Sequence, residues 1–183
     1  MVNTRADAVR NRERLVAAAA QMFGDHGVDV PLEDIAKHAG VSIGTLYNHF
    51  PNREALLDAA LPDWGLMMDR LAEEALADPD PWHGFAQFMV AMFEIQARDR
   101  AINDSVALGS AGPVDVEAQS RRSGMGMESV LDMAHQANVV RADFGPDDLV
   151  ALVWAMAQVI AKSEVGDDRW LRHLGFVLDG LRA

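Results

Sequence analysis

The stretch LEDIAKHAGVSIGTLYNHF, residues 32–50, holds the pattern of two short helices and a tight turn in nineteen positions. Ile35 supplies the apolar inner face of the first helix. Gly40 ends that helix, because the residue just past a helix often takes the left-handed conformation that glycine tolerates best. Ser42 can cap the free amide groups of the helix that follows. This pattern is typical of a helix-turn-helix, whose second helix enters the major groove of DNA.

The second helix of the motif has an apolar side and a polar side. Leu46 and Phe50 lie four residues apart, so both face the first helix. The opposite side presents polar or minimal groups, which can meet phosphates and base edges. These outward residues are Gly44, Thr45, Tyr47, Asn48 and His49.

The outward side chains differ in what they can recognise on DNA. Thr45 offers a methyl group to thymine and a hydroxyl to base edges, and the Asn48 amide can pair with adenine. Tyr47 and His49 carry hydroxyl and ring N–H groups that suit phosphate oxygens, which fix position without specifying sequence. The alternative interpretation is a pair of amphipathic helices joined by glycine, an arrangement found in many helical proteins.

Two basic residues complete the predicted interface. Arg53 stands near the start of the next helix, where its charge adds to the exposed amides of that terminus and favours a phosphate. Lys37 lies on the first motif helix, within reach of the backbone. The predicted DNA-binding residues are therefore Lys37, Ser42, Gly44, Thr45, Tyr47, Asn48, His49 and Arg53.

Residues 1–57 resemble the DNA-binding head of the tetracycline-repressor (TetR) family of transcription regulators. Two positions depart from the pattern: Pro31 stands where relatives often have a capping threonine, and Ile43 where they often have a lysine. The resemblance implies an all-helical homodimer whose remaining residues form a ligand-sensing and dimerising bundle, with repression as the usual outcome. It is carried by Ala18 to Phe23, Gly27, Leu32-Glu33-Asp34-Ile35-Ala36, Ala39-Gly40-Val41-Ser42, Gly44-Thr45-Leu46-Tyr47, His49-Phe50 and Arg53-Glu54-Ala55-Leu56-Leu57.

The charge is unevenly distributed along the chain. The net charge is −12, yet residues 1–53 balance six Lys and Arg against six Asp and Glu, so the whole excess lies in residues 54–183. An acidic body repelled by DNA would present the neutral head to the duplex, although an acidic surface kept for solubility explains the same pattern. With no cysteine, no export signal and no run of eighteen apolar residues, a cytoplasmic protein is expected.

The sequence predicts an all-α fold of about nine helices, divided into a DNA-binding domain, residues 1–52, and a ligand-binding and dimerisation domain, residues 53–183. No alternating strand pattern appears. Pro62 predicts a kink or a break in the helix that starts at Arg53, because an interior proline removes a helical hydrogen bond. Further helices are expected over residues 82–98, 101–108, 113–138 and 146–162, followed by a final helix that contains Trp170 and Leu181.

The body pattern also predicts a dimer interface and a ligand cavity. Residues 146–162 are apolar almost all round, which indicates burial on two sides and favours a seam with a second subunit. The predicted seam comprises Val153, Met156, Ile160, Trp170, Leu174 and Leu178. Flexible thioethers and aromatic groups suggest a cavity for a small, largely apolar molecule, although ordinary core packing is the competing interpretation. Its predicted lining is Met67, Met89, Phe93, Met125, Met133 and Trp154, with Gln96, Gln158 and His135 as polar contacts.

Two other classes of function compete with a DNA-binding regulator. A helical-bundle metalloenzyme needs two Glu-x-x-His pairs on separate helices, whereas only Asp132 and His135 have comparable spacing here. A small-molecule-binding protein without a DNA role leaves the helix-turn-helix unexplained. We therefore expect no catalysis, no metal and no cofactor. The expected function is a ligand-responsive repressor that binds palindromic double-stranded DNA as a homodimer and is released by a small molecule.

Overall fold

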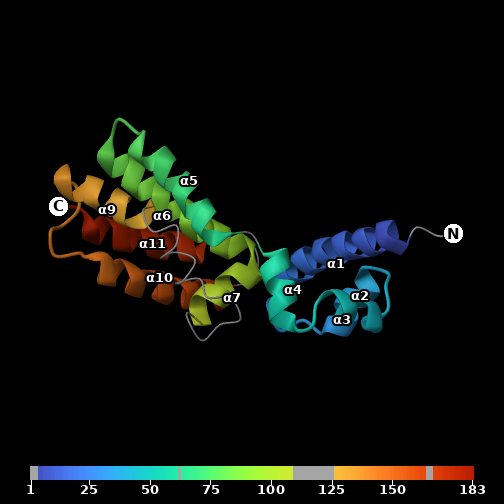
Figure 1. Cartoon of the computed structure of the whole chain (residues 1–183). Coiled ribbons are helices and arrows are strands. Elements are labelled where there is room, and N and C mark those ends of the chain that lie inside the picture. Colours follow the sequence, from blue (N-terminus) through green and yellow to red (C-terminus); the bar gives the residue numbers. More distant parts are fainter. Residues whose placement is uncertain (1–3, 62, 109–125, 164–166) are drawn as a thin grey trace.

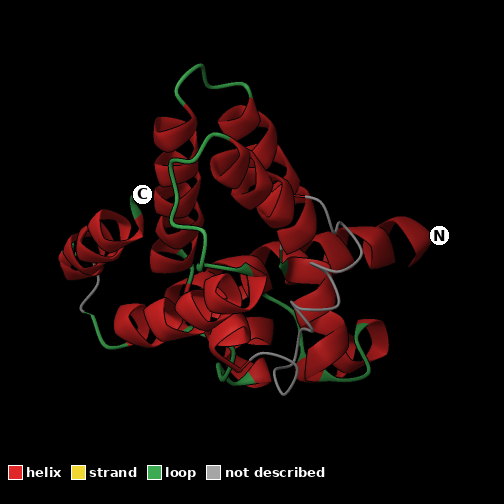
Figure 2. Ribbon diagram, turned by 90° about the vertical axis from the view of Figure 1, so that its left-hand side faces the viewer, coloured by secondary structure: helices red, strands yellow, loops and turns green. Residues whose placement is uncertain are grey.

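The computed structural model describes residues 4–61, 63–108, 126–163 and 167–183 and confirms an all-α protein. The helices and the loops that connect them are shown in Figure 2. None of the described helices is both long enough and apolar enough to cross a membrane. The helices are α1 (Thr4–His26), α2 (Leu32–His38), α3 (Ile43–His49), α4 (Arg53–Ala60), α5 (Trp64–Leu76), α6 (Pro81–Arg98), α7 (Arg100–Leu108), α9 (Gly126–Gln136), α10 (Pro146–Ala161) and α11 (Arg169–Leu181).

The helices gather into a small head and a larger body. Figure 1 shows α1, α2 and α3 at the amino-terminal end, with α4 and α7 where head and body meet. The head has its own core, in which Leu15, Phe23, Ile35 and Leu46 are completely buried. Because α1 packs against α2, α3, α4 and α7, this one helix braces the head and also connects it to the body.

The predicted break between the fourth and fifth helices is confirmed. The first of these helices ends at Ala60, and the second begins at Trp64, whose preceding residue Asp63 caps it by accepting a bond of 3.2 Å from the Leu66 amide. Pro62, the residue that motivated the prediction, lies outside the described residues. The chain thus starts a new helix, with its own cap, as it enters the body.

Three body helices, α5, α6 and α9, pack closely against one another because glycine lies at two of their contacts. A methyl group on Gly84 would overlap the Ala75 carbonyl oxygen of the neighbouring helix. A methyl group on Gly126 would lie 3.0 Å from the Met68 carbonyl oxygen. Only a residue without a side chain lets these backbones approach so closely.

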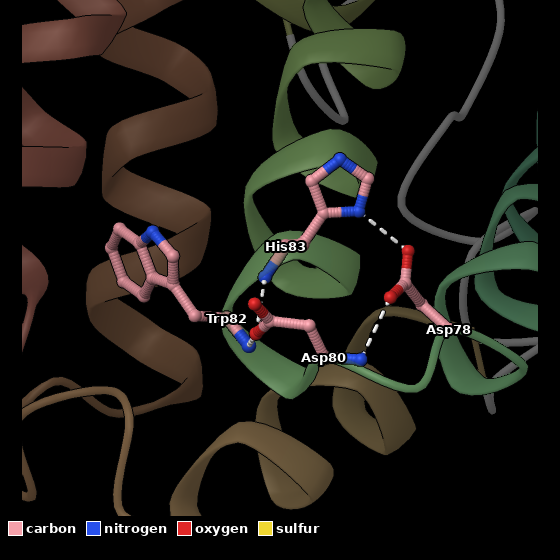
Figure 3. A network of polar contacts seen from close by, with 4 residues as sticks. All are labelled: Asp78, Asp80, Trp82 and His83. Carbon is pink, nitrogen blue, oxygen red and sulfur yellow. Dashed lines mark hydrogen bonds and ion pairs between the residues drawn. The ribbon is translucent and has the colours of Figure 1, made fainter.

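The turn between α5 and α6 is closed by a small polar network (Figure 3). Asp80 caps the second helix, its carboxylate accepting bonds of 3.0 and 3.2 Å from the Trp82 and His83 amides. Asp78 accepts a bond of 2.8 Å from the Asp80 amide, and its other oxygen lies 2.6 Å from His83 Nδ1. The hydrogen bond with His83 is the main reason why the pKa of Asp78 is lowered.

The carboxyl-terminal part of the chain closes the body. Helix α10 packs against α6, α7 and α11, and an isolated antiparallel bridge pairs Val140 with Arg182. The Arg182 guanidinium also lies over the Trp82 ring, 5.0 Å from its centre. The long helix expected over residues 113–138 is described only as α9, because residues 109–125 lie outside the described part of the chain.

Candidate functional site

The turn between α2 and α3 has the geometry expected from its sequence. Gly40 has φ +67°, the left-handed conformation that was predicted for it. The Ser42 side-chain oxygen accepts a bond of 3.2 Å from the Thr45 amide, which confirms the predicted cap. The two hydroxyl oxygens, Ser42 Oγ and Thr45 Oγ1, lie 2.9 Å apart. The serine cap therefore fixes the start of α3 in the protein alone.

The inner side of α3 is packed as predicted. Leu46 is completely buried and Phe50 is 3% exposed, so both anchor this helix to the head core. Arg12 of the first helix lies over the Phe50 ring, 5.2 Å from its centre. Buried anchors on one side hold the polar side of the same helix in a fixed orientation.

The outer side of α3 forms an exposed polar surface. Tyr47 is 49% exposed, and Gly44 and Asn48 are exposed beside it. Thr45 and His49 are half-buried, so less of each side chain is accessible. Ser42 and, on the other motif helix, Lys37 are also exposed. The structure thus brings most of the predicted DNA-binding residues to the surface of one helix-turn-helix, while their contacts with DNA stay a prediction.

Arg53 already has partners inside the protein. Its Nη1 donates to the carbonyl oxygens of Val28, at 2.7 Å, and Val30, at 2.6 Å. These carbonyls belong to the loop between α1 and α2, so the half-buried guanidinium ties the start of α4 to that loop. The sequence suggested only a phosphate clamp and gave no sign of this internal bond. A phosphate contact, if made, uses the remaining guanidinium nitrogens.

The same loop also contacts the body. Asp104 of α7 accepts a bond of 3.2 Å from the Val28 amide. Gly27, the residue directly before Val28, has φ +88°, and a methyl group on Gly27 would overlap the Asp104 carboxylate. Asp99, at the start of the same body helix, is partly buried, and burial is the main cause that raises its pKa. The loop between α1 and α2 is therefore held by Asp104 from the body and by Arg53 from the start of α4.

The residues predicted for the dimer seam are buried in the single chain, and their place in an interface stays untested. Val153, Met156, Ile160, Trp170, Leu174 and Leu178 are all buried within the single chain. Their burial leaves little surface for a partner, so they belong to the core of the subunit. The sequence pattern of α10 showed apolar residues on two sides but not which side faces inward. The large apolar side chains left exposed on α10 and α11 are Val150, Trp154, Leu171 and Phe176.

The structure also separates the residues predicted to line a ligand cavity. Met89 and Phe93 are completely buried, and Met67 and Met133 are half-buried against the core. Trp154 is 45% exposed on the surface, so its placement in an interior cavity was wrong. Met125 lies outside the described residues. The competing interpretation, ordinary core packing, explains the four methionine and phenylalanine side chains that can be placed.

A pocket of about 380 Å³ lies elsewhere in the body, between the end of α6, α7, the end of α10 and the start of α11. Two buried amide side chains contribute to its wall, Gln96 and Asn103. The sequence singled out Gln96 as a polar contact and missed Asn103, which sits on a different helix. No local signal joins these two residues, because only the packing of α6 against α7 and α10 brings them together.

Two family models match different parts of the chain. Residues 15–60 match the model for bacterial regulatory proteins of the tetR family. Residues 80–183 match the model for the C-terminal domain of SbtR-like transcriptional regulators. The first match contains the helix-turn-helix, and the second contains the pocket and the exposed apolar residues of the last two helices.

Curated relatives align over part of their length. The transcriptional repressor BepR of Brucella suis is 31% identical over 102 residues, which cover 54% of this chain and 49% of BepR. The regulator TtgR of Pseudomonas putida is 33% identical over 107 residues, covering 55% of this chain and 51% of TtgR. The matched segment thus spans about half the length of these relatives.

Solved structures align over nearly the whole chain. A TetR transcription regulatory protein from Mycobacterium vanbaalenii is 30% identical, with 98% of this chain and 99% of that one covered and a TM-score of 0.51. The TetR transcriptional regulator SCO0520 from Streptomyces coelicolor is 28% identical, with 93% and 98% covered and a TM-score of 0.56. The similarity therefore extends over head and body together.

Proposed function

This chain belongs to the tetR family of bacterial regulatory proteins, and on that basis we propose that it is a ligand-responsive repressor that binds a palindromic DNA site as a homodimer. The observation that carries the proposal is the exposed polar side of α3, with Tyr47 and Asn48 held outward by the buried Leu46. Repression is proposed because one of the curated relatives, BepR, is a transcriptional repressor.

In this proposal the outward side chains divide into two roles. Asn48 and Thr45 read base edges, while Tyr47, His49 and Lys37 hold phosphates. The head comprises residues 1–52 and the body residues 53–183. The zero net charge of residues 1–53 supports this orientation, because the acidic body is the part that DNA repels.

A second copy of the chain is the proposed partner of the exposed apolar side chains on α10 and α11. Trp154 and Val150 lie one turn apart on the first of these helices, and Leu171 and Phe176 lie on the second. Tryptophan and phenylalanine side chains contribute most of their interface energy when they are removed from water. Two subunits would then deliver two heads to successive major grooves.

Release by a ligand requires a physical link between the body and the head. Asp104 provides one, because it belongs to the pocket wall and also accepts a bond from the Val28 amide. Arg53 holds the carbonyl of that same residue from the other side. A ligand that binds better to a dimer with displaced heads weakens DNA binding by its difference in affinity for the two states.

The division of roles on α3 is tested by two substitutions. Tyr47→Ala should weaken binding to all DNA sequences alike, since a phosphate contact carries no sequence information. Asn48→Ala should relax the preference at one base position, by about 1–3 kcal/mol. Affinities are measured for a set of single-base variants of the selected site, with Gln87→Ala on an exposed body position as the control. The reverse pattern would contradict the assignment.

The alternative of a helical-bundle metalloenzyme is not favoured. Among the residues that the structure describes, no group of three or more His, Asp or Glu side chains gathers in a way that could hold a metal ion. The comparisons support transcriptional regulators in both halves of the chain. A small-molecule-binding protein without a DNA role would not explain why α3 is capped and presents polar side chains on its exposed side.

A further inference from the structure

The body pocket contains buried amide groups that have no partner. Gln96 is 1% exposed, and neither its Nε2 nor its Oε1 has a hydrogen-bond partner among the described residues. Asn103 is 3% exposed; its Nδ2 donates to the Ala157 carbonyl at 3.1 Å, while its Oδ1 has no such partner. A buried polar group without a partner destabilises a fold. Both residues belong to the wall of the same pocket.

The size of the pocket fits a small molecule. Its volume of about 380 Å³ falls in the range of ligand sites, and it is more than a single ordered water needs. Its remaining wall includes apolar groups from Ala97, Ile160 and Trp170. Apolar walls with a few convergent polar groups are the usual composition of a site that orients a small ligand.

The charges around the pocket restrict the ligand further. Four carboxylates line it, from Glu94, Asp104, Asp167 and Asp168, against two guanidinium groups, from Arg98 and Arg100. Arg98 is already paired with Glu94 on its own helix, and Asp167 with Arg169, which leaves Asp104 and Asp168 against Arg100. The wall is thus acidic on balance, and it opposes an anionic guest while favouring one that is neutral or positive.

The unpartnered atoms indicate which groups the guest must carry. Gln96 Oε1 and Asn103 Oδ1 are acceptors, and Gln96 Nε2 is a donor. A guest with two N–H donors and one acceptor would match all three atoms. An apolar guest would leave them as they are, without hydrogen bonds, and a carboxylate would add repulsion from the acidic wall.

We propose that the pocket between α6, α7, α10 and α11 is the effector site, and that it takes a small molecule rich in N–H donors and without negative charge, held by Gln96 and Asn103. The proposal rests on the function proposed above, because it names the ligand class to which that regulator responds. It also differs from the largely apolar ligand and the Met-lined cavity expected from the sequence.

Four ring compounds of similar size test the ligand class in the full-length chain. Benzamidinium is a cationic donor, benzamide is neutral, benzoate is an anionic acceptor and toluene is apolar. At millimolar concentration, benzamidinium and benzamide should both raise the unfolding temperature, because each carries N–H donors without a negative charge, whereas benzoate and toluene should not. No shift with benzamidinium, or an equal or larger shift with benzoate or toluene, would overturn the proposed class.

Gln96→Leu tests the site itself, with Gln87→Leu on the exposed side of the same helix as the matched control. Without a probe, Gln96→Leu should raise the unfolding temperature, since it replaces an unpartnered amide by an apolar group of similar size. It should also weaken benzamidinium binding about tenfold or more, whereas the control should bind as the wild type does. If Gln96→Leu instead lowers the unfolding temperature and keeps the benzamidinium shift, the amides bind only ordered water and the proposal is wrong.

DNA binding by the same proteins separates this inference from the proposed function. The control Gln87→Leu should bind DNA as the wild type does in the absence of a probe, because Gln87 lies on the exposed side of a body helix. DNA binding without any dependence of the thermal shift on Gln96 would overturn the effector site and leave the regulator intact. A Gln96-dependent shift in a chain that binds no DNA would leave the binding site standing while the regulatory function fails.

Discussion

The head and the body satisfy their buried groups to different degrees. In the head, Gly40 takes the left-handed conformation, Ser42 caps α3 and Arg53 binds two loop carbonyls. In the body, buried nitrogen or oxygen atoms of Gln96, Asn103 and His135 have no partner, and among the described residues all such side-chain atoms lie there.

The exposed apolar surface follows a similar division. The body leaves two aromatic side chains on its surface, Trp154 and Phe176, whereas the exposed aromatic residue of the head is Tyr47, which carries a hydroxyl. The head therefore presents the polar side of α3 to an outside polymer, although Val9 on α1 is exposed as well. The body contains buried polar atoms that a ligand would satisfy. It also exposes apolar side chains that a second subunit would cover.

The largest expected effects come from paired truncations of one buried head residue and one exposed body residue. Leu46→Ala should lower the free energy of unfolding by about 2–5 kcal/mol, because a completely buried leucine leaves a cavity. Trp154→Ala should weaken dimer association by about 2 kcal/mol or more, which is about a 30-fold rise in the dissociation constant. Chemical denaturation measures the first change, and sedimentation equilibrium the second.

Leu76→Ala serves as the control for this pair, since Leu76 is also a large exposed apolar residue but lies on α5. It should leave the dissociation constant unchanged. If Leu76→Ala and Trp154→Ala weaken association equally, or neither does, the exposed side chain on α10 is not part of the interface. The exposed apolar side chains on α10 and α11 would then no longer indicate that the body needs a second subunit.

A smaller effect is expected from Arg53→Met, which keeps the side-chain stem and removes the guanidinium. Loss of the bonds to the Val28 and Val30 carbonyls should lower the stability of the head by about 1–3 kcal/mol. If Arg53 only contacted phosphate, Arg53→Met would leave the free energy of unfolding unchanged. It would instead reduce the salt dependence of DNA binding by about one ion. Denaturation of the free protein and a salt titration of DNA binding separate these two roles.

The smallest effect is expected at the junction of head and body, where burial raises the pKa of Asp99. An acid whose pKa is raised by folding favours the folded state when it is protonated, so ionised Asp99 opposes folding at neutral pH. Asp99→Asn keeps a side chain that can accept the bond from the Ile102 amide. The variant should therefore be more stable than wild type at pH 7.

That difference should vanish as the pH falls below the ordinary pKa of aspartate, because Asp99 is then protonated in both the folded and the unfolded state. Urea denaturation at neutral and acidic pH measures it. A variant that is less stable than wild type at pH 7 would mean that the cap and the helix terminus favour the charge more than burial opposes it.

The head could be predicted from the sequence because its signals are local. Gly40, Ser42, Leu46 and Phe50 each act on a helix within four residues, so spacing alone assigns their roles. The break after α4 was predicted for the same reason. The internal bonds of Arg53 could not be predicted, since they join residues more than twenty positions apart.

The body could be predicted only as a set of helices. The pattern of α10 shows apolar residues on two sides, and burial then places Val153 inside and Trp154 outside, the reverse of the roles expected from the sequence. The pocket is formed by two segments that lie far apart in the sequence, residues 94–104 and residues 160–170, so no spacing rule brings its walls together. Tertiary packing decides both features.

Selection of bound fragments from random DNA by the full-length protein, at low ionic strength, tests the central claim most directly. Two identical subunits that present α3 to successive major grooves should enrich a palindrome whose half-sites are separated by a whole number of helical turns. Enrichment of a single unpaired half-site, or of no sequence at all, would contradict the account.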